Sequence, residues 1–212
     1  MSKSDRVVVV GAVGIDTNVY LFGDDIDFSV EANFSNNVDY VGQAGGYSAR
    51  IFSALGYETA FIGFVGDDIG GREVRRKFES DGIDISTLGI DPQGTKRSIN
   101  FMYKDGRRKN FYDGRGSMET NVEVEKYRAL FREAKVAHFS IVNWARFLLP
   151  LAKEEGCLVS CDIQDVVDPE DEYRKDFIEQ SDVLFFSSVN HTNLAGLLHY
   201  FLGRGPQIVV CG

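Results

Sequence analysis

The feature that most constrains this chain is a regular alternation between short apolar segments and longer segments with helical periodicity. The segment 6–11 contains four consecutive valines without a polar interruption, which is typical of a parallel strand covered on both faces. Similar apolar segments occur at 59–65, 136–142, 158–163, 183–186 and 208–211, and helical patterns occur at 45–55, 70–80, 143–155, 169–180 and 192–202. This alternation predicts the α/β class: an open, mostly parallel sheet with helices on both faces.

Two segments have the period of a strand instead of a helix. In residues 18–41 the apolar and aromatic side chains fall mostly at even spacing, and residues 98–113 alternate on both sides of an Asp105–Gly106 pair. An Asp-Gly pair between alternating runs is a strong signal for a tight hairpin. Because a lone hairpin is marginal in water, we expect the two segments to form one small antiparallel sheet, inserted into a single domain of residues 1–212.

The charge balance disfavours some classes of partner. The chain has 212 residues, with 23 Lys+Arg, 32 Asp+Glu and a net charge of −9. This balance disfavours binding to nucleic-acid phosphates or to an anionic membrane surface, both of which need a basic face. No segment approaches the roughly 20 apolar residues of a membrane helix. The cysteines form no Cys-x-x-Cys pair, so we expect reduced thiols in a cytoplasmic protein. The apolar start of the chain ends at Asp16 without a cleavage pattern, so we expect a buried strand there and no signal peptide.

The turns after the predicted strands are the places to search for chemistry, because open α/β sheets bind ligands beyond the carboxyl ends of their strands. The first of these segments contains Gly14 and Asp16. A carboxylate there could accept hydrogen bonds from ligand hydroxyls, and an ordinary capping aspartate explains it equally well. The segment is not a dinucleotide-binding motif, because the middle glycine is missing and no helix follows at the usual spacing.

Two further turns lead into predicted helices. The first, Gly42-Gln43-Ala44-Gly45-Gly46-Tyr47, places backbone N–H groups where an anion or a sugar hydroxyl could bind, and it lacks the Gly-Lys-Ser/Thr ending of a P-loop. The second contains Asp67 and Asp68. We favour helix capping over a metal pair there, because neighbouring side chains on a turn rarely converge on one ion.

The remaining polar clusters have simple structural explanations. A solvated hairpin tip accounts better than an anionic ligand for the basic residues on and after the predicted turn, which are Lys104, Arg107, Arg108, Lys109 and Arg115. The histidines, His138, His191 and His199, are far apart and have no partner at metal-ligand spacing. We expect them to be structural and predict no protein metal site.

Together these segments resemble the ribokinase-like (PfkB) carbohydrate kinase family, and specifically its N-terminal portion. The sharpest similarity is Thr59-Ala-Phe-Ile-Gly-Phe-Val-Gly-Asp-Asp-Ile-Gly-Gly71 followed by Asp81-Gly-Ile-Asp84, and the next is the glycine spacing from Gly42 to Gly56. In this family two inserted segments form an antiparallel lid, which agrees with the strand-period segments 18–41 and 98–113.

The resemblance implies a chemistry and a set of site residues. The family transfers the γ-phosphoryl group of ATP to a hydroxyl of a sugar or nucleoside, with Mg²⁺ as cofactor and a lid that excludes water. Asp16 would bind sugar hydroxyls, Gly14 and Gly42 would line the pocket, and Gln43 and Tyr47 occupy neighbouring positions of the family signature. A second copy could pack on the outer face of the lid and give a homodimer.

The chain also departs from the family pattern. Gln43 stands in place of a glycine, and Tyr47 in place of an asparagine that contacts the sugar. Ser187-Ser-Val-Asn190 replaces an Asn-x-x-Glu motif, and the Asp-Thr-x-Gly-Ala-Gly-Asp segment with the catalytic aspartate does not occur up to Gly212. We therefore expect the catalytic aspartate beyond Gly212, in a chain truncated at its C-terminal end.

Two alternatives stay open. One is a non-catalytic member of the same fold that binds a sugar or nucleoside. The other is a Rossmann-like nucleotide-dependent enzyme, which the missing Gly-x-Gly-x-x-Gly motif disfavours.

Overall fold

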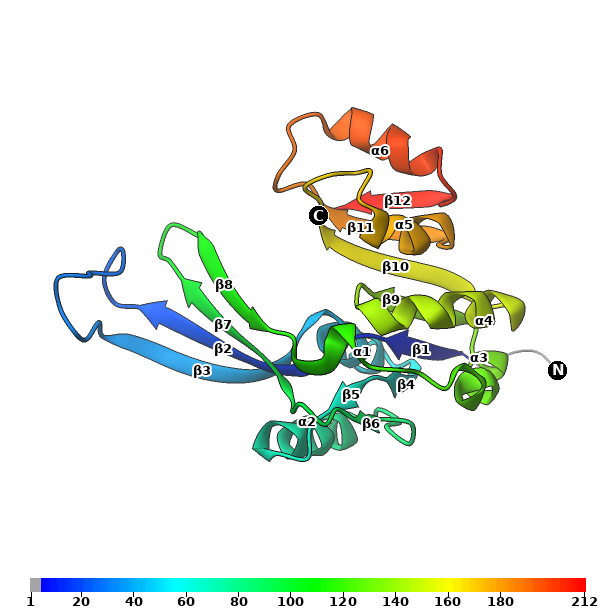
Figure 1. The fold of residues 1–212 in the computed structure, drawn as a ribbon, viewed down its shortest axis with the longest axis horizontal. Helices are drawn as coiled ribbons and strands as arrows, with labels where there is room; N and C mark the ends of the chain where they lie inside the picture. The colour runs from blue at the N-terminus through cyan, green and yellow to red at the C-terminus, as the bar shows by residue number, and fades with distance from the viewer. Residues whose placement is uncertain (1–4) are drawn as a thin grey trace.

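The computed structural model describes residues 5–212 and arranges them as a main sheet with helices and a smaller sheet that projects from it (Figure 1). In the described residues the main sheet has six strands in the order β12–β11–β10–β9–β1–β4, and every neighbouring pair is parallel. The strands are β1 (Arg6–Val10), β4 (Glu58–Ile62), β9 (Val136–Ser140), β10 (Leu158–Asp165), β11 (Val183–Ser187) and β12 (Ile208–Cys211). The predicted α/β class and parallel sheet are confirmed.

Helices cover both faces of the sheet at its central strand β1, which is apolar on both sides. Val7 and Val9 of β1 belong to one core cluster, which includes residues of α1 (Ala44–Ala54) and α2 (Ile69–Ser80). Val8 and Val10 face the opposite core. That second core is built with α3 (Arg128–Glu133), the 3₁₀ helix η3 (Asn143–Leu148), α4 (Leu149–Glu154), α5 (Glu172–Glu179) and α6 (Leu194–Leu202).

The structure divides two of the predicted elements. The apolar segment 59–65 ends as β4 at Ile62, and the separate strand β5 (Phe64–Val65) pairs with β6 (Gly89–Ile90). The break falls at Gly63, where an added Cβ would lie 2.3 Å from the Phe61 ring. The predicted helix 143–155 begins as the 3₁₀ helix η3 and continues as α4. Sequence patterns also missed α3 and the short 3₁₀ helices η1 (Arg115–Met118) and η2 (Val124–Tyr127).

The small sheet, called the lid below, combines the two segments with strand periodicity. Its strands, in the order β3–β2–β7–β8, are β3 (Ser35–Gly42), β2 (Gly14–Leu21), β7 (Lys96–Met102) and β8 (Arg108–Asp113). The two hairpins are antiparallel as predicted, and β2 joins β7 in parallel. β2 begins at Gly14, before the predicted segment 18–41, and β7 begins at Lys96, before the predicted segment 98–113. Residues 14–17, which look like a turn in sequence, belong to β2.

The Asp105–Gly106 pair forms the predicted tight turn between β7 and β8. Gly106 has a φ of +89°, in the left-handed region that glycine adopts without strain. Nearby charges pair across the exposed tip: Arg107 lies 2.6 Å from Asp105, and Lys104 lies 3.1 Å from Asp24. These contacts agree with a solvated hairpin tip.

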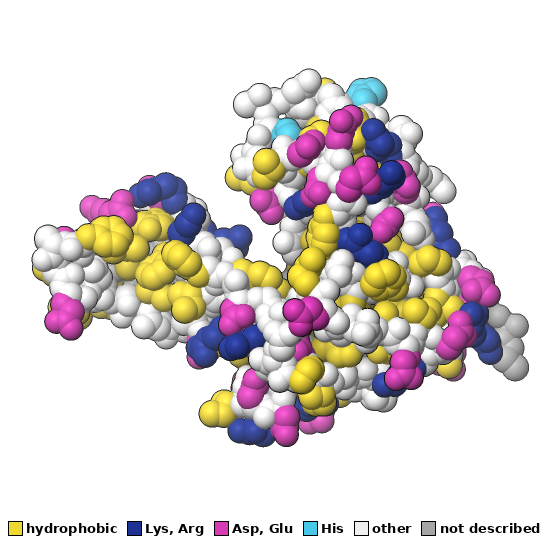
Figure 2. All heavy atoms as spheres, in the orientation of Figure 1, with side chains coloured by type: hydrophobic (Ala, Val, Ile, Leu, Met, Phe, Trp, Pro, Cys, Tyr) yellow, Lys and Arg dark blue, Asp and Glu magenta, His cyan; other side chains and the backbone are white. Residues whose placement is uncertain are grey.

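Apolar surface is exposed in two regions. On the lid, hydrophobic side chains gather on the face turned to the viewer in Figure 2. On β10, β11 and β12, one side of the main sheet exposes Leu158, Phe185, Ile208 and Val210, while the alternate residues of these strands pack against the helices of the opposite face. No helix within residues 5–212 is long and apolar enough to cross a bilayer.

His138 is a structural residue of the main sheet. It lies on β9 and is 7% exposed, with its Nδ1 2.8 Å from Ser160 Oγ and its ring against Phe52 and Phe185. Burial lowers the pKa of His138 to about 4. The imidazole is therefore neutral in the folded protein at physiological pH.

This shifted pKa predicts a specific loss of stability in acid. As pH falls below about 6.5, the unfolded chain protonates His138 while the folded chain stays neutral until about pH 4. The free energy of unfolding should fall by about 3 kcal/mol across this window. Urea unfolding of the wild type and of His138→Asn across this pH range measures the contribution, and equal pH slopes for the two proteins would contradict it.

Candidate functional site

The five predicted substrate-binding residues lie together where the lid meets the main sheet. β2 follows β1 almost directly, and β3 leads into α1, so Gly14 pairs with Gly42 across the first hairpin. The Asp16 cluster, as used below, consists of Gly14, Asp16, Gly42, Gln43, Tyr47 and Ser98. Of these, only Ser98 was not singled out from the sequence, since a lone serine in a strand carries no local signal.

The Asp16 carboxylate is nearly buried and accepts two hydrogen bonds from Gln43. Asp16 is 7% exposed, and its Oδ2 accepts a hydrogen bond of 3.0 Å from the backbone N–H of Gln43. The Gln43 side-chain amide donates to Asp16 Oδ1 and also to Ser98 Oγ at 2.9 Å. Both carboxylate oxygens therefore already accept a hydrogen bond, and any ligand hydroxyl must share them with Gln43 or displace its amide.

Tyr47 places a phenol beside this carboxylate from the first turn of α1. Burial and the negative charge of Asp16 raise the pKa of Tyr47 to about 12, so the phenol stays protonated. No side chain fits at Gly42, because an added Cβ would lie 2.3 Å from Asp16 Oδ2 and 2.6 Å from the Tyr47 hydroxyl oxygen. At Gly14 an added Cβ would lie 2.2 Å from the Lys96 carbonyl oxygen. A side chain at Gly42 would therefore displace Asp16 or Tyr47, and one at Gly14 would clash with the backbone of β7.

Gln43 has a strained backbone. Its φ of 66° and ψ of 161° lie in a region that essentially only glycine populates. Such a conformation costs about 1–3 kcal/mol and persists where the surrounding contacts enforce it. Here the two hydrogen bonds to Asp16 and the start of α1 hold it in place.

Comparison of two variants isolates this strain. Gln43→Gly and Gln43→Ala both remove the side-chain amide, but only glycine adopts the observed φ without strain. The free energy of unfolding of Gln43→Gly should exceed that of Gln43→Ala by about 1–2 kcal/mol. Urea unfolding measures the difference.

Ala44→Gly is the control, because the expected preference between glycine and alanine is reversed there. Ala44 is the first residue of α1, and its replacement by glycine should lower the free energy of unfolding by about 0.5–1 kcal/mol. If Gln43→Ala is as stable as Gln43→Gly, the backbone at residue 43 is not strained.

A buried ion pair anchors the lid beside the cluster. Lys96 Nζ lies 3.3 Å from Asp91 Oδ2, with side chains 1% and 0% exposed. The same carboxylate accepts a hydrogen bond of 3.0 Å from the Gly116 N–H, and burial lowers the pKa of Lys96. The pair joins the residue after β6 to the start of β7, and the Gly116 hydrogen bond adds η1 to this contact. Nothing in the local sequence distinguished the pair.

Of the two acidic candidates before α2, Asp68 has a structural role. Asp68 caps α2 by accepting from the Gly71 N–H at 2.8 Å, and it also accepts from Thr95 Oγ1 at 2.6 Å. The capping interpretation is therefore confirmed. Within residues 5–212 no three histidine, cysteine or acidic side chains come together in a way that could hold a metal ion.

Asp162 is a carboxylate that sequence reasoning passed over. It lies within β10 opposite Ser140, the last residue of β9, and burial raises its pKa. Its Oδ1 accepts a hydrogen bond of 2.9 Å from the Gln164 N–H. The only signal in the sequence is an aspartate that interrupts an apolar run near its carboxyl end.

Comparison with known proteins identifies the family. Residues 4–195 match the profile described as pfkB family carbohydrate kinase. The chain belongs to this family. It is 26% identical over 211 residues to the acarbose 7(IV)-phosphotransferase of Actinoplanes sp., covering 99% of this chain and 70% of that protein. These matches support a phosphotransferase at the level of the family.

Solved structures of pfkB and ribokinase-like kinases share the fold. A microbiome-derived acarbose kinase superposes with a TM-score of 0.85 at 30% identity, covering 99% of this chain and 70% of that one. A ribokinase from Arabidopsis thaliana, solved with ribose and ATP, has a TM-score of 0.77 at 16% identity, covering 100% and 72%. The second comparison bears on the fold alone.

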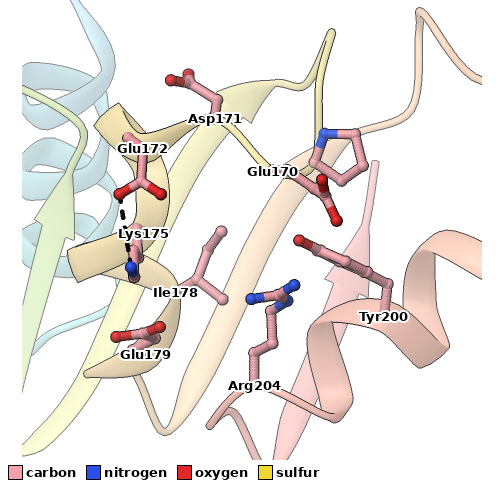
Figure 3. Close-up of a pocket in the computed structure, with 9 residues that line it drawn as sticks. Glu170, Asp171, Glu172, Lys175, Ile178, Glu179, Tyr200 and Arg204 are labelled. Atoms are coloured by element: carbon pink, nitrogen blue, oxygen red, sulfur yellow. Dashed lines mark ion pairs between the residues drawn. The ribbon is translucent and has the colours of Figure 1, made fainter.

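A pocket lined mostly by charged residues lies away from the Asp16 cluster. It has a volume of about 290 Å³ and lies between α5 and α6 (Figure 3). Both basic side chains in its lining have a partner. Lys175 lies 3.5 Å from Glu172, and the Arg204 guanidinium lies 4.1 Å from the centre of the Tyr200 ring. The remaining lining is mostly acidic and shares no residue with the Asp16 cluster.

Proposed function

We propose that this chain forms the substrate-binding part of a kinase that transfers the γ-phosphoryl group of ATP to a hydroxyl of a sugar or nucleoside. The observation that carries the proposal is the Asp16 carboxylate, nearly buried at the base of the lid and bordered by the Gln43 amide, the Tyr47 phenol and the Ser98 hydroxyl. Such a set of neutral donors around one carboxylate suits a ligand with several hydroxyls.

Each group has a proposed role. Asp16 accepts hydrogen bonds from substrate hydroxyls, and the Gln43 amide and Tyr47 phenol orient the ring beside it. Gly14 and Gly42 line the same site. The lid covers the bound substrate and excludes water, which protects the phosphoryl group from hydrolysis.

ATP and Mg²⁺ are the proposed cofactors. ATP supplies the phosphoryl group, and Mg²⁺ neutralises charge on the phosphates as they react. Mg²⁺ is usually bound through phosphates with only one or two carboxylates. Asp162, at the carboxyl edge of the main sheet, is the carboxylate that we propose for this role. We assign no catalytic base within residues 1–212, because the Asp-Thr-x-Gly-Ala-Gly-Asp segment of the family does not occur there.

Removal of the Asp16 carboxylate tests the proposed site. Asp16→Ala should weaken binding of a sugar ligand by roughly tenfold to a hundredfold, the loss expected for hydrogen bonds to a charged group. Isothermal titration with ribose, fructose, adenosine and acarbose measures the affinities. Asp39→Ala is the matched control, because Asp39 is an exposed aspartate on the other face of the lid. Unchanged affinity in Asp16→Ala would show that the substrate binds elsewhere.

A non-catalytic sugar- or nucleoside-binding protein is the second candidate. It is favoured by the Gln43 amide that already occupies Asp16, and by Ser187 and Asn190 at positions where the resemblance implies other residues. An assay of ADP release with the same ligands separates the two candidates. Binding accompanied by turnover supports the kinase, and binding without turnover supports the second candidate.

The proposed partners are a small-molecule sugar or nucleoside and a second copy of this chain, in the cytoplasm, without nucleic acid or a membrane surface. The outer face of the lid has an apolar groove of about 520 Å³, lined in part by Val19, Leu21, Phe28, Phe101 and Phe111. Phe28 is 91% exposed and Phe111 is 56% exposed. An apolar patch of this kind is typical of a protein interface.

Charge placed in this groove should separate the two copies. Phe111→Asp is expected to shift the mass in solution from that of a dimer to that of a monomer, because it buries an unpaired carboxylate at the interface. Light scattering after size exclusion measures the mass. Phe147→Asp, at a comparably exposed phenylalanine on η3, should leave the mass unchanged. A wild type that is already monomeric would rule out the lid dimer.

A further inference from the structure

The lid face that carries Asp16 also carries a row of asparagines. Strand register places Asp16 beside Tyr40, Ser98 and Tyr112, which together form a first row across the sheet. Two residues further along the strands, the register aligns Asn18 with Asn100 and Asn100 with Asn110. Since side chains alternate between faces, this asparagine row points to the same side of the lid as the first row.

The asparagine row is a connected set of amides. Asn100 Nδ2 donates to Asn18 Oδ1 at 3.0 Å, and Asn110 Nδ2 donates to Asn100 Oδ1 at 2.8 Å. Asparagine is depleted in strands, so three in register across neighbouring strands run against local preference. Each amide has two N–H donors and a carbonyl with two lone pairs, and the row uses only part of this capacity.

Two residues of extended strand separate the two rows by about 7 Å. A ligand held at the Asp16 cluster could therefore extend along the same face to the asparagine row. Tyr40 and Tyr112 end the first row on its two sides, 39% and 51% exposed, so aromatic surface borders the path between the rows. The row itself carries no charge, which suits neutral hydroxyls better than a phosphate or a carboxylate.

We propose that the asparagine row is a subsite for the second ring of a glycoside whose first ring lies at the Asp16 cluster. This inference rests on the proposed function and narrows its substrate class to saccharides of two or more rings. Asn18 is half-buried and Asn110 is exposed, so the amides at the two ends of the row are the ones that a ligand reaches.

Matched pairs of one-ring and two-ring ligands test the subsite by isothermal titration of the chain. The pairs are glucose with maltose, galactose with lactose and fructose with sucrose, and ribose and adenosine complete the panel. At least one two-ring ligand should bind tenfold or more tightly than its one-ring partner. Asn110→Ala and the double variant Asn18→Ala, Asn110→Ala should remove this advantage and leave one-ring affinity within twofold.

Asn37→Ala is the matched control, because Asn37 is an exposed asparagine on the opposite face of the same sheet and should leave all affinities unchanged. Thermal unfolding verifies that each variant is folded, and the single Asn110→Ala variant changes only an exposed side chain. Equal affinities within every pair, or an advantage that persists in Asn110→Ala and the double variant, would overturn the subsite while the proposed function stands. If ribose or adenosine binds and none of the two-ring saccharides does, the subsite is likewise overturned while the proposed function stands. Absence of binding by the whole panel would overturn both.

Discussion

The structure around the candidate site depends on the contact between Asp16 and Gln43. Burying a carboxylate is costly unless donors surround it, and here one residue supplies both a backbone and a side-chain N–H. That arrangement forces the backbone of Gln43 into a glycine-like conformation and leaves no room for a side chain at Gly42. The carboxylate, the strained residue and the glycine therefore act as one unit at the junction of lid and helix.

The lid depends on a second buried charge. Lys96 and Asp91 pair without solvent contact at the start of β7, and the Gly116 N–H completes the contacts of the carboxylate. Removing one partner of such a pair leaves an uncompensated buried charge, which costs about 3–5 kcal/mol. The parallel pairing of β7 with β2 begins at Lys96 and brings Ser98 next to Asp16. The same pairing aligns Asn18 with Asn100 in the asparagine row.

The two faces of the lid have opposite chemistry. Alternate residues of β2 place Asp16 and Asn18 on one face and Val19 and Leu21 on the other. The single period-2 pattern in the sequence therefore encodes a polar face, where we propose that the ligand binds, and an apolar face, on which we propose that a second copy packs.

Periodicity in the sequence was sufficient to predict the main sheet, its helices and the hairpin at Asp105–Gly106, because these elements follow from local patterns of burial and turn chemistry. The same is true of the cap at Asp68 and of the positions of Asp16 and Gln43 next to predicted strand and helix ends. The parallel pairing of β2 with β7 and the pairing of β5 with β6 beyond the break at Gly63 were decided only by the tertiary structure. Each depends on contacts between segments distant in sequence, and no local pattern of side chains records which distant strand will lie beside it.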